Sequence, residues 1–192
     1  MIKMTEKELL SFFPEIAQIE KPEWRNAVTQ IWLEAYDTSS YQSLSDAGFH
    51  VSAPQCGLVK HTRAVTLGAL ALAKITESVL GISCDKDKLI VLCLLHDVCK
   101  VLEMESEPDG VRGAVRKTVA GKYYQHGFLS GYYALKYGLP EEIVGLLVAH
   151  TDKSSVLPDT VEGICMYYAD EAMADQAFKA AGAKLIMHKF KP

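Results

Sequence analysis

Two polar side chains, His96 and Asp97, directly follow the apolar run 89–95. A helix that is apolar on every side is typical of the centre of a fold. Placing an imidazole and a carboxylate at the end of such a helix is costly unless each is paired or bound to a metal. The dipeptide therefore indicates a metal site, with an Asp–His hydrogen bond that caps the helix as the alternative.

Asp170 is a second carboxylate on an apolar helix face. The residues four and three positions before it and after it are Met166, Tyr167, Met173 and Ala174. A carboxylate on that face points into the core, where it requires a cation or a set of hydrogen-bond donors.

Three more histidines stand at predicted helix ends. His126 opens one predicted helix and His150 closes the next, with a turn at 138–140 between them. Two helices joined by a short turn are antiparallel, so their outer ends meet in space. His61 stands near the start of its own helix, where it can face a neighbouring helix end.

These residues form a nitrogen and oxygen ligand set without thiolates. The set is His61, His96, Asp97, His126, His150 and Asp170. Such ligands suit a divalent transition metal, namely iron, manganese, zinc or cobalt. With Asp97 bridging, six ligands suffice for two metals per chain, and a pair of metals activates water for in-line displacement at phosphorus.

The order of these residues and their local contexts resemble the HD-domain superfamily of metal-dependent phosphohydrolases, in the branch that binds two metals. The matching segments are VKHTRAVTLGALALAKI, LIVLCLLHDVCK, HGFLSGYYALKYGLPEEIVGLLVAH and MYYADEAMAD. The resemblance spans Val59 to Ala174. Residues 1–50 and the polar stretch 103–122 resemble nothing known.

The resemblance implies a role for each ligand. His61, His96, Asp97 and Asp170 would hold the first metal, and His126, His150 and the bridging Asp97 the second. Lys100, in the H-D-x-x-K position, would act with Asp97 in catalysis by pairing with a substrate phosphate or a ligand carboxylate; a surface lysine is the alternative.

Other polar residues have weaker contexts. Candidates for clamping a substrate phosphate are Arg63, Arg112, Arg116, Lys117 and Lys122. A solvated charged surface is the alternative for all of them. His50 and His188 are expected to be structural, and Glu171 and Asp175 to be solvated surface charges.

The resemblance implies an enzyme that hydrolyses a phosphate ester or anhydride of a small anionic molecule such as a nucleotide. A few members are instead mixed-valent di-iron oxygenases that cleave C–C or C–P bonds with the same ligands. A regulatory module that binds metal without catalysis is the third hypothesis. All six ligand positions hold competent residues, which counts against the third.

Most of the chain has sequence patterns typical of helices, and these helices would position the residues named above. The expected helices are 5–13, 22–36, 59–80, 85–96, 125–137, 140–150 and 159–181. They start at capping residues or prolines and stop at glycines or before prolines. Residues 37–57, 103–122 and 151–158 are expected to be loops, with 103–122 a mobile flap over an anionic substrate. The fold is therefore predicted to be all-α, a single helical bundle over 1–192 with an N-terminal extension, 1–50, and an HD core, 59–174.

Length and composition set outer limits. The chain has 192 residues, enough for about one domain. Its net charge of −4 argues against a binder of duplex nucleic acid. No apolar stretch resembles a signal peptide or a membrane span. Five cysteines without a C-x-x-C pair predict reduced thiols in a cytoplasmic protein. A homo-oligomer is compatible with the sequence.

Overall fold

The computed structural model describes residues 4–151, 154 and 156–189 and confirms an all-α fold. Its α-helices are α1 (Glu6–Phe12), α2 (Pro22–Thr38), α3 (Leu58–Ile75), α4 (Lys86–Leu95), α5 (Lys100–Glu103), α6 (His126–Lys136), α7 (Glu141–Ala149) and α8 (Val161–Ala180). Short 3-10 turns are η1 (Pro14–Gln18), η2 (Leu44–Asp46), η4 (Ala120–Lys122) and η5 (Ile186–Lys189), and η3 (Thr76–Leu80) is a π-helical turn. Two strands, β1 (Met104–Ser106) and β2 (Val115–Lys117), complete the described structure.

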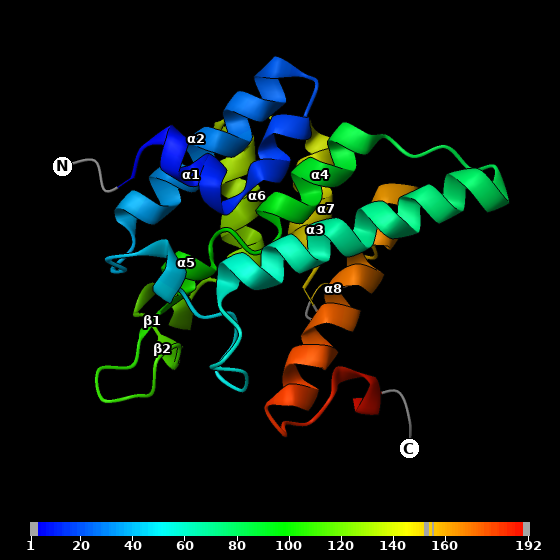
Figure 1. Ribbon diagram of the computed structural model, residues 1–192. Helices are drawn as coiled ribbons and strands as arrows, with labels where there is room; N and C mark the ends of the chain where they lie inside the picture. The colour runs from blue at the N-terminus through cyan, green and yellow to red at the C-terminus, as the bar shows by residue number, and fades with distance from the viewer. Residues whose placement is uncertain (1–3, 152–153, 155, 190–192) are drawn as a thin grey trace.

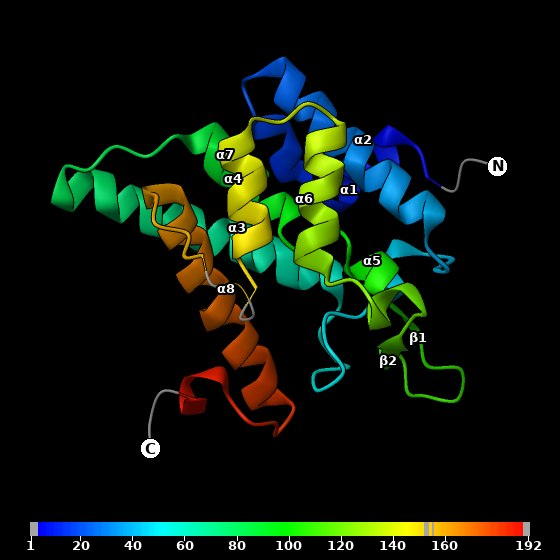
Figure 2. The same ribbon diagram turned by 180° about the vertical axis from the view of Figure 1, so that it is seen from behind.

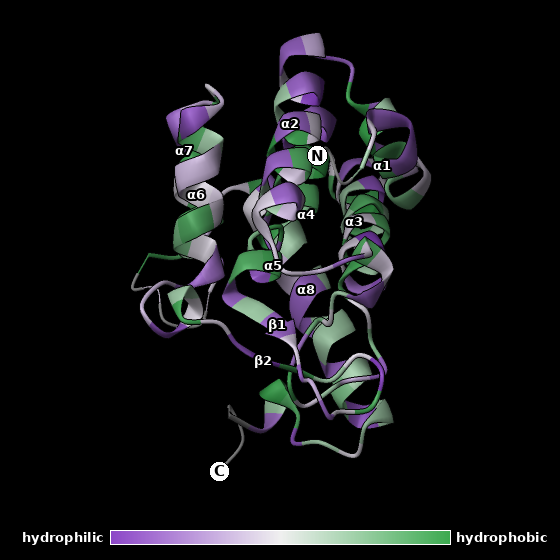
Figure 3. Cartoon of the chain, turned by 90° about the vertical axis from the view of Figure 1, so that its left-hand side faces the viewer, coloured by the Kyte–Doolittle hydropathy of each residue, from purple (hydrophilic) through white to green (hydrophobic). Residues whose placement is uncertain are grey.

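The apolar helix α4 lies at the centre of the molecule. All side chains of 89–95 are fully buried, because α2, α3, α7 and α8 pack around it. Figure 1 shows α4 between α2 above and α3 below, and Figure 3 shows its apolar colouring. The Asp85 side chain caps the helix by accepting a hydrogen bond from the Lys88 amide at 3.0 Å. The His96–Asp97 dipeptide therefore stands at the end of the most deeply buried element.

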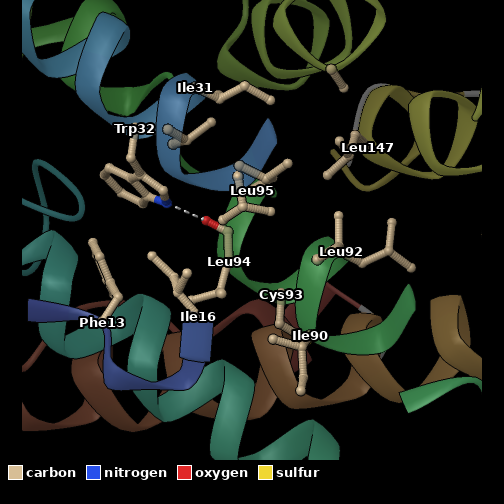
Figure 4. Packing of buried hydrophobic residues seen from close by; sticks show 14 of the residues in the cluster. Phe13, Ile16, Ile31, Trp32, Ile90, Leu92, Cys93, Leu94, Leu95 and Leu147 are labelled. Carbon is tan, nitrogen blue, oxygen red and sulfur yellow. Dashed lines mark hydrogen bonds between the residues drawn. The ribbon is translucent and has the colours of Figure 1, made fainter. Parts of the chain in front are cut away.

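The N-terminal helices share the core with α4. Thr5 and Glu8 form the predicted capping box at the start of α1. The Trp32 indole of α2 packs on the Phe13 ring, with centroids 4.5 Å apart, and donates to the Leu94 carbonyl at 2.9 Å (Figure 4). One cluster of buried apolar side chains includes members from α1, α2, α4 and α8, the first in sequence being Met4 and the last Ala169. That the chain is a single domain stays a prediction.

Helix α3 is the long diagonal element of Figures 1 and 2, and it packs along α8. Its last turn loosens into η3, and Gly81 ends it in the left-handed conformation at φ +69°. The predicted helix over 59–80 is thus an α-helix continued by a π-helical turn.

The stretch 103–122 is a β-hairpin, so the prediction of a loop was wrong in part. Met104 pairs with Lys117 and Ser106 with Val115, while Glu105 and Arg116 form an ion pair at 2.9 Å. Met104 and Val115 are buried. The strands of three residues each are too short to produce a clear alternating pattern between the glycines and the proline of this stretch.

Helices α6 and α7 form the expected antiparallel pair, side by side in Figure 2. The turn between them contains Gly138 at φ +73°. Gly127 and Gly131 face α7 so closely that a Cβ atom at Gly131 would lie 2.4 Å from a Val148 methyl carbon. The pair of glycines therefore permits the close approach that brings the two outer helix ends together.

Within the residues that the structure describes, no helix is both long and apolar enough to span a membrane.

Candidate metal centre

Five elements bring all six predicted ligands to one point. His61 lies in the first turn of α3, and Asp170 lies midway along α8. The remaining four stand at helix ends: His96 and Asp97 after α4, His126 at the start of α6, and His150 after α7. They form two groups, and within each group the ligand atoms lie within 4.8 Å of one another. The groups are His61, His96 and Asp170, and Asp97, His126 and His150.

Asp97 connects the two groups. One of its carboxylate oxygens faces the imidazoles of the first group, and the other faces those of the second. Its Oδ2 is 3.4 Å from Nε2 of both His61 and His96. Its Oδ1 is 3.1 Å from His126 Nε2 and 3.8 Å from His150 Nε2. This arrangement is the one that a carboxylate bridging two cations requires.

Asp170 completes the first group. Its Oδ1 is 3.0 Å from His61 Nε2 and 3.7 Å from His96 Nε2. In the second group, the rings of His126 and His150 have centroids 5.2 Å apart. That separation is within the span of a site that holds metals about 4 Å apart.

Hydrogen bonds on the far side of three rings orient them toward Asp97. The Nδ1 atom of His96 is 2.7 Å from the Cys93 carbonyl oxygen, and that of His150 is 2.5 Å from the Leu147 oxygen. In its neutral form each of these two rings can donate from Nδ1 and present the lone pair of Nε2 to a cation, the arrangement of most metal-binding histidines. His126 Nδ1 lies 2.5 Å from a carboxylate oxygen of Glu103, which orients this ring in the same way.

The atoms that face this point lack hydrogen-bond partners among the described residues. They are Nε2 of His61, His96 and His150, and Oδ2 of Asp97, all buried. Asp97 Oδ2 does have the Lys100 ammonium 3.2 Å away, but the three imidazole nitrogens have no hydrogen-bond partner among these residues. Buried polar atoms are nearly always hydrogen-bonded, so three such nitrogens converging on one point require an explanation. Divalent cations fit this set of imidazole nitrogens and carboxylate oxygens.

Electrostatics favour a cation here as well. Burial raises the pKa of Asp97, but Lys100 and His96 outweigh it and hold this pKa well below its usual range. Burial also raises the pKa of Asp170, yet the neighbouring His96 and His61 lower it to about 2. Burial lowers the pKa of His96, and the two carboxylates outweigh that effect and raise it to about 9. Two ionised carboxylates, Asp97 buried and Asp170 half-buried, thus favour positive charge at this point.

A cavity of about 380 Å³ opens onto the ligands. Asp97, His126, His150 and Asp170 line it, while His61 and His96 lie behind them at no more than 1% exposure. A cavity of this size accommodates a small molecule.

Lys100 stands beside the ligands, as the resemblance implied. Its ammonium nitrogen is 3.2 Å from Asp97 Oδ2 and 3.3 Å from the Phe49 carbonyl oxygen. The side chain is buried and lines the cavity, so the alternative of a surface lysine is wrong.

The structure does not bring the five predicted clamp residues to this cavity. Arg63 forms a two-pronged ion pair with Glu15. Arg112 pairs with Asp46, and Arg116 pairs with Glu105.

The two clamp lysines have different positions. The Lys117 ammonium nitrogen lies 3.0 Å from a carboxylate oxygen of Glu103. Glu103 in turn contacts His126, so Lys117 is linked to the predicted ligands only through Glu103. Lys122 is exposed in η4. Arg112, Arg116 and Lys117 were expected on a flap over the substrate, whereas Arg116 pairs with Glu105 across the two strands of the hairpin.

Four further residues at the site were not predicted from the sequence to belong to it. Glu103 holds His126, and Phe49 stacks on His61 with ring centroids 3.6 Å apart. His50, expected to be structural only, lines the cavity together with Lys184. All of them lie outside the apolar helices whose pattern revealed the ligands.

Two acids expected to be solvated are also placed differently. Glu171 lines the cavity. Asp175 accepts hydrogen bonds from the amides of Ile186 and Met187 at 2.5 and 3.1 Å. The Asp175 carboxylate thus binds the segment that follows α8.

Comparison with known proteins identifies the class. The HD domain family matches residues 58–175, a range that contains all six predicted ligands. The chain belongs to the HD-domain family, which confirms the resemblance.

One curated relative is the dihydroneopterin 2′,3′-cyclic phosphate phosphodiesterase of Methanocaldococcus jannaschii. This chain is 31% identical to it over 117 residues, which cover 60% of this chain and 45% of the relative. The chain thus spans less than half the length of that protein. No solved structure gives a significant match.

Proposed function

We propose that the protein is a metal-dependent hydrolase that cleaves a phosphate ester or anhydride of a small molecule. The observation that carries this proposal is the position of Asp97, which faces two imidazole groups with its two oxygens at the base of a cavity. Membership of the HD-domain family supports it.

Six residues of the chain would hold two divalent cations. His61, His96 and Asp170 would bind the first, His126 and His150 the second, and Asp97 both. Bound divalent ions supply an activated water at neutral pH and neutralise charge that develops on phosphoryl oxygens.

The chain itself would provide binding and orientation. Lys100 places an ammonium group at the cavity wall beside Asp97, where it would hold a phosphoryl oxygen. The hydrogen bonds from His96 and His150 to backbone carbonyls fix the rings before substrate arrives, so little reorganisation is needed during the reaction.

A phosphodiester is the substrate class that the comparisons favour. The relative named above acts on a cyclic phosphodiester. The cavity of about 380 Å³ suits a compound of nucleotide size better than a duplex. The di-iron oxygenase alternative would use the same six ligands, and the activity named for the relative favours hydrolysis over it.

The test compares wild type with Asp97→Ala after loading with Mn²⁺. We expect wild type to open nucleoside 2′,3′-cyclic phosphates by addition of water, giving nucleoside monophosphates, and Asp97→Ala to lose both bound metal and turnover. Asp109→Ala, which removes an exposed carboxylate near the hairpin tip, is the matched control and should keep both. Full metal occupancy in Asp97→Ala would overturn the proposal.

A second measurement separates hydrolysis from oxygenation. Protein purified without oxygen should show no dioxygen consumption and no mixed-valent iron signal after exposure to air. Two irons per chain with such a signal would favour the oxygenase instead.

A further inference from the structure

The chain after α8 forms a wall of the candidate metal cavity. Gly182, at φ +70°, ends the helix and reverses the chain direction. The Ala183 amide then donates to the Phe178 carbonyl at 2.9 Å. Figure 1 shows the segment turning back beside the lower end of α8, and Lys184, Leu185 and Ile186 line the cavity.

This segment is held in place by polar and apolar contacts. The Asp175 carboxylate accepts hydrogen bonds from two successive amides, those of Ile186 and Met187. Ala183, Leu185 and Ile186 also pack on a small apolar cluster of α8 and the 49–53 region. The position of Lys184 is therefore fixed by its neighbours on both sides in sequence.

Two lysines line the cavity, and they differ in exposure. Lys100 is buried, with its ammonium group between the Asp97 carboxylate, the Phe49 carbonyl and the Phe49 ring. Lys184, by contrast, is exposed on the cavity rim. The flexible side chain of a lysine in this position can bind the outer oxygens of an anion whose inner oxygens lie beside Lys100.

We infer that Lys184 binds the phosphate of the substrate from the rim of the cavity, and that Asp175 positions it by anchoring the segment that carries it. This inference rests on the proposed function and deepens it by assigning substrate binding to a segment outside the range 58–175 that matches the family. The ligand it specifies is a small phosphate ester with oxygens accessible at the rim.

The first experiment uses inorganic phosphate as the probe, with binding to Mn²⁺-loaded protein measured by calorimetry. Because charge-assisted hydrogen bonds to phosphate are strong, we expect Lys184→Gln to weaken binding about tenfold while metal content stays unchanged. Lys184→Arg should restore most of the affinity. Lys179→Gln is the matched control, because this lysine lines a neighbouring apolar groove and not the candidate metal cavity.

The second experiment is kinetic. On a cyclic phosphodiester, Lys184→Gln should raise KM about tenfold and change kcat less than twofold, because rim binding is lost without loss of metal. Asp175→Asn should raise KM in the same direction, and adding it to Lys184→Gln should have little further effect, as expected for residues that act as one unit.

Two results would overturn the inference: phosphate affinity of Lys184→Gln equal to that of wild type, or no phosphate binding by loaded wild type. Phosphate binding that depends on Lys184, in a protein that hydrolyses no phosphate ester, would instead contradict the proposed function and leave the rim site in place.

Discussion

Asp97 organises the candidate centre at the level of single residues. Its two oxygens face different imidazole pairs, and Lys100 lies 3.2 Å from one of them. Two of the four rings donate to backbone carbonyls of their own helices, whereas His126 depends on a carboxylate from another element, Glu103. The second ligand group therefore depends on a residue that is not itself a ligand.

We predict that Glu103→Gln weakens binding of the second metal about 10–100-fold, the usual range for residues that orient metal ligands. Burial raises the pKa of Glu103, but His126 and Lys117 outweigh it and lower the pKa to about 2, so the ionised form makes these contacts at neutral pH. A neutral amide holds the ring less strongly. Chelator competition with Mn²⁺ measures the two affinities.

The control for this substitution is Glu105→Gln, which removes an acid of the same hairpin that pairs with Arg116. It should leave both metal affinities unchanged. Equal affinities in Glu103→Gln and wild type would show that His126 needs no orienting carboxylate.

The six predicted ligands could be found in the sequence because each of these carboxylates and imidazoles begins, interrupts or ends an apolar helical pattern. Glu103 gave no such signal, since it lies in the single turn of α5 before a strand that the pattern did not reveal. The position of Lys184 could not be predicted either, because it depends on the turn at Gly182 and on the hydrogen bonds to Asp175. Contacts formed by tertiary packing leave no periodic trace in the sequence.

At the level of elements, the close approach of α6 and α7 sets the position of the second ligand group. A Cβ atom at Gly127 would lie 2.7 Å from a Thr151 methyl carbon and 3.2 Å from His150 Cε1. The absence of a side chain at Gly127 thus makes room for the His150 ring. The turn between the helices was predicted, but this glycine contact was not.

We predict that Gly127→Ala weakens binding of the second metal and lowers the free energy of unfolding by about 1–2 kcal/mol, since overpacking displaces neighbours. Gly145→Ala is the control: it lies in α7 with nothing within 4 Å of the added carbon. That variant should be more stable than wild type by about 0.5–1 kcal/mol, because alanine favours helix. Urea unfolding and chelator competition measure both effects, and unchanged metal affinity in Gly127→Ala would contradict the prediction.

Helix α8 is tied to the start of α4 by a buried acid, Glu162. Its carboxylate accepts hydrogen bonds from the Asp85 amide at 2.8 Å and lies 2.7 Å from the Lys88 ammonium. Thr160, rather than the predicted Asp159, is the N-cap of α8. The ion pair thus aligns the helix that carries Asp170 with the helix that ends at His96.

The Glu162 contacts predict a pH-dependent stability. Burial raises the pKa of Glu162, but Lys88 and the Asp85 amide outweigh it, so the pKa is below its ordinary value of 4.5. The ionised form therefore stabilises the fold above pH 4.5, and this contribution is lost as the pH falls through the lowered pKa. Glu162→Gln should cost about 1–2 kcal/mol at pH 7 and progressively less below pH 4.5.

Urea unfolding at a series of pH values measures this difference. Glu142→Gln is the matched control, because Glu142 contacts the same lysine from an exposed position and should contribute less than about 0.5 kcal/mol. A Glu162→Gln deficit that stays constant from pH 7 to acid conditions would rule out the ionised carboxylate as its source.

Across the whole molecule, helices α3, α4, α6, α7 and α8 converge on the polar centre around Asp97. The N-terminal helices reach it through Trp32, whose indole donates to the Leu94 carbonyl next to the His96 turn. The C-terminal segment reaches it through Lys184. The all-α bundle was predictable from helical periodicity, whereas these two contributions from outside the family match were not. A cytoplasmic location and a homo-oligomer stay predictions.

The number of metal ions per chain is the most direct measurement of whether the six residues act as one centre. After loading with Mn²⁺ and removal of excess, elemental analysis of wild type should give two ions per chain. The double variant His126→Ala, His150→Ala should give one, because His61, His96, Asp97 and Asp170 remain. A wild type that retains no ion, or a double variant that still retains two, would contradict the site described above.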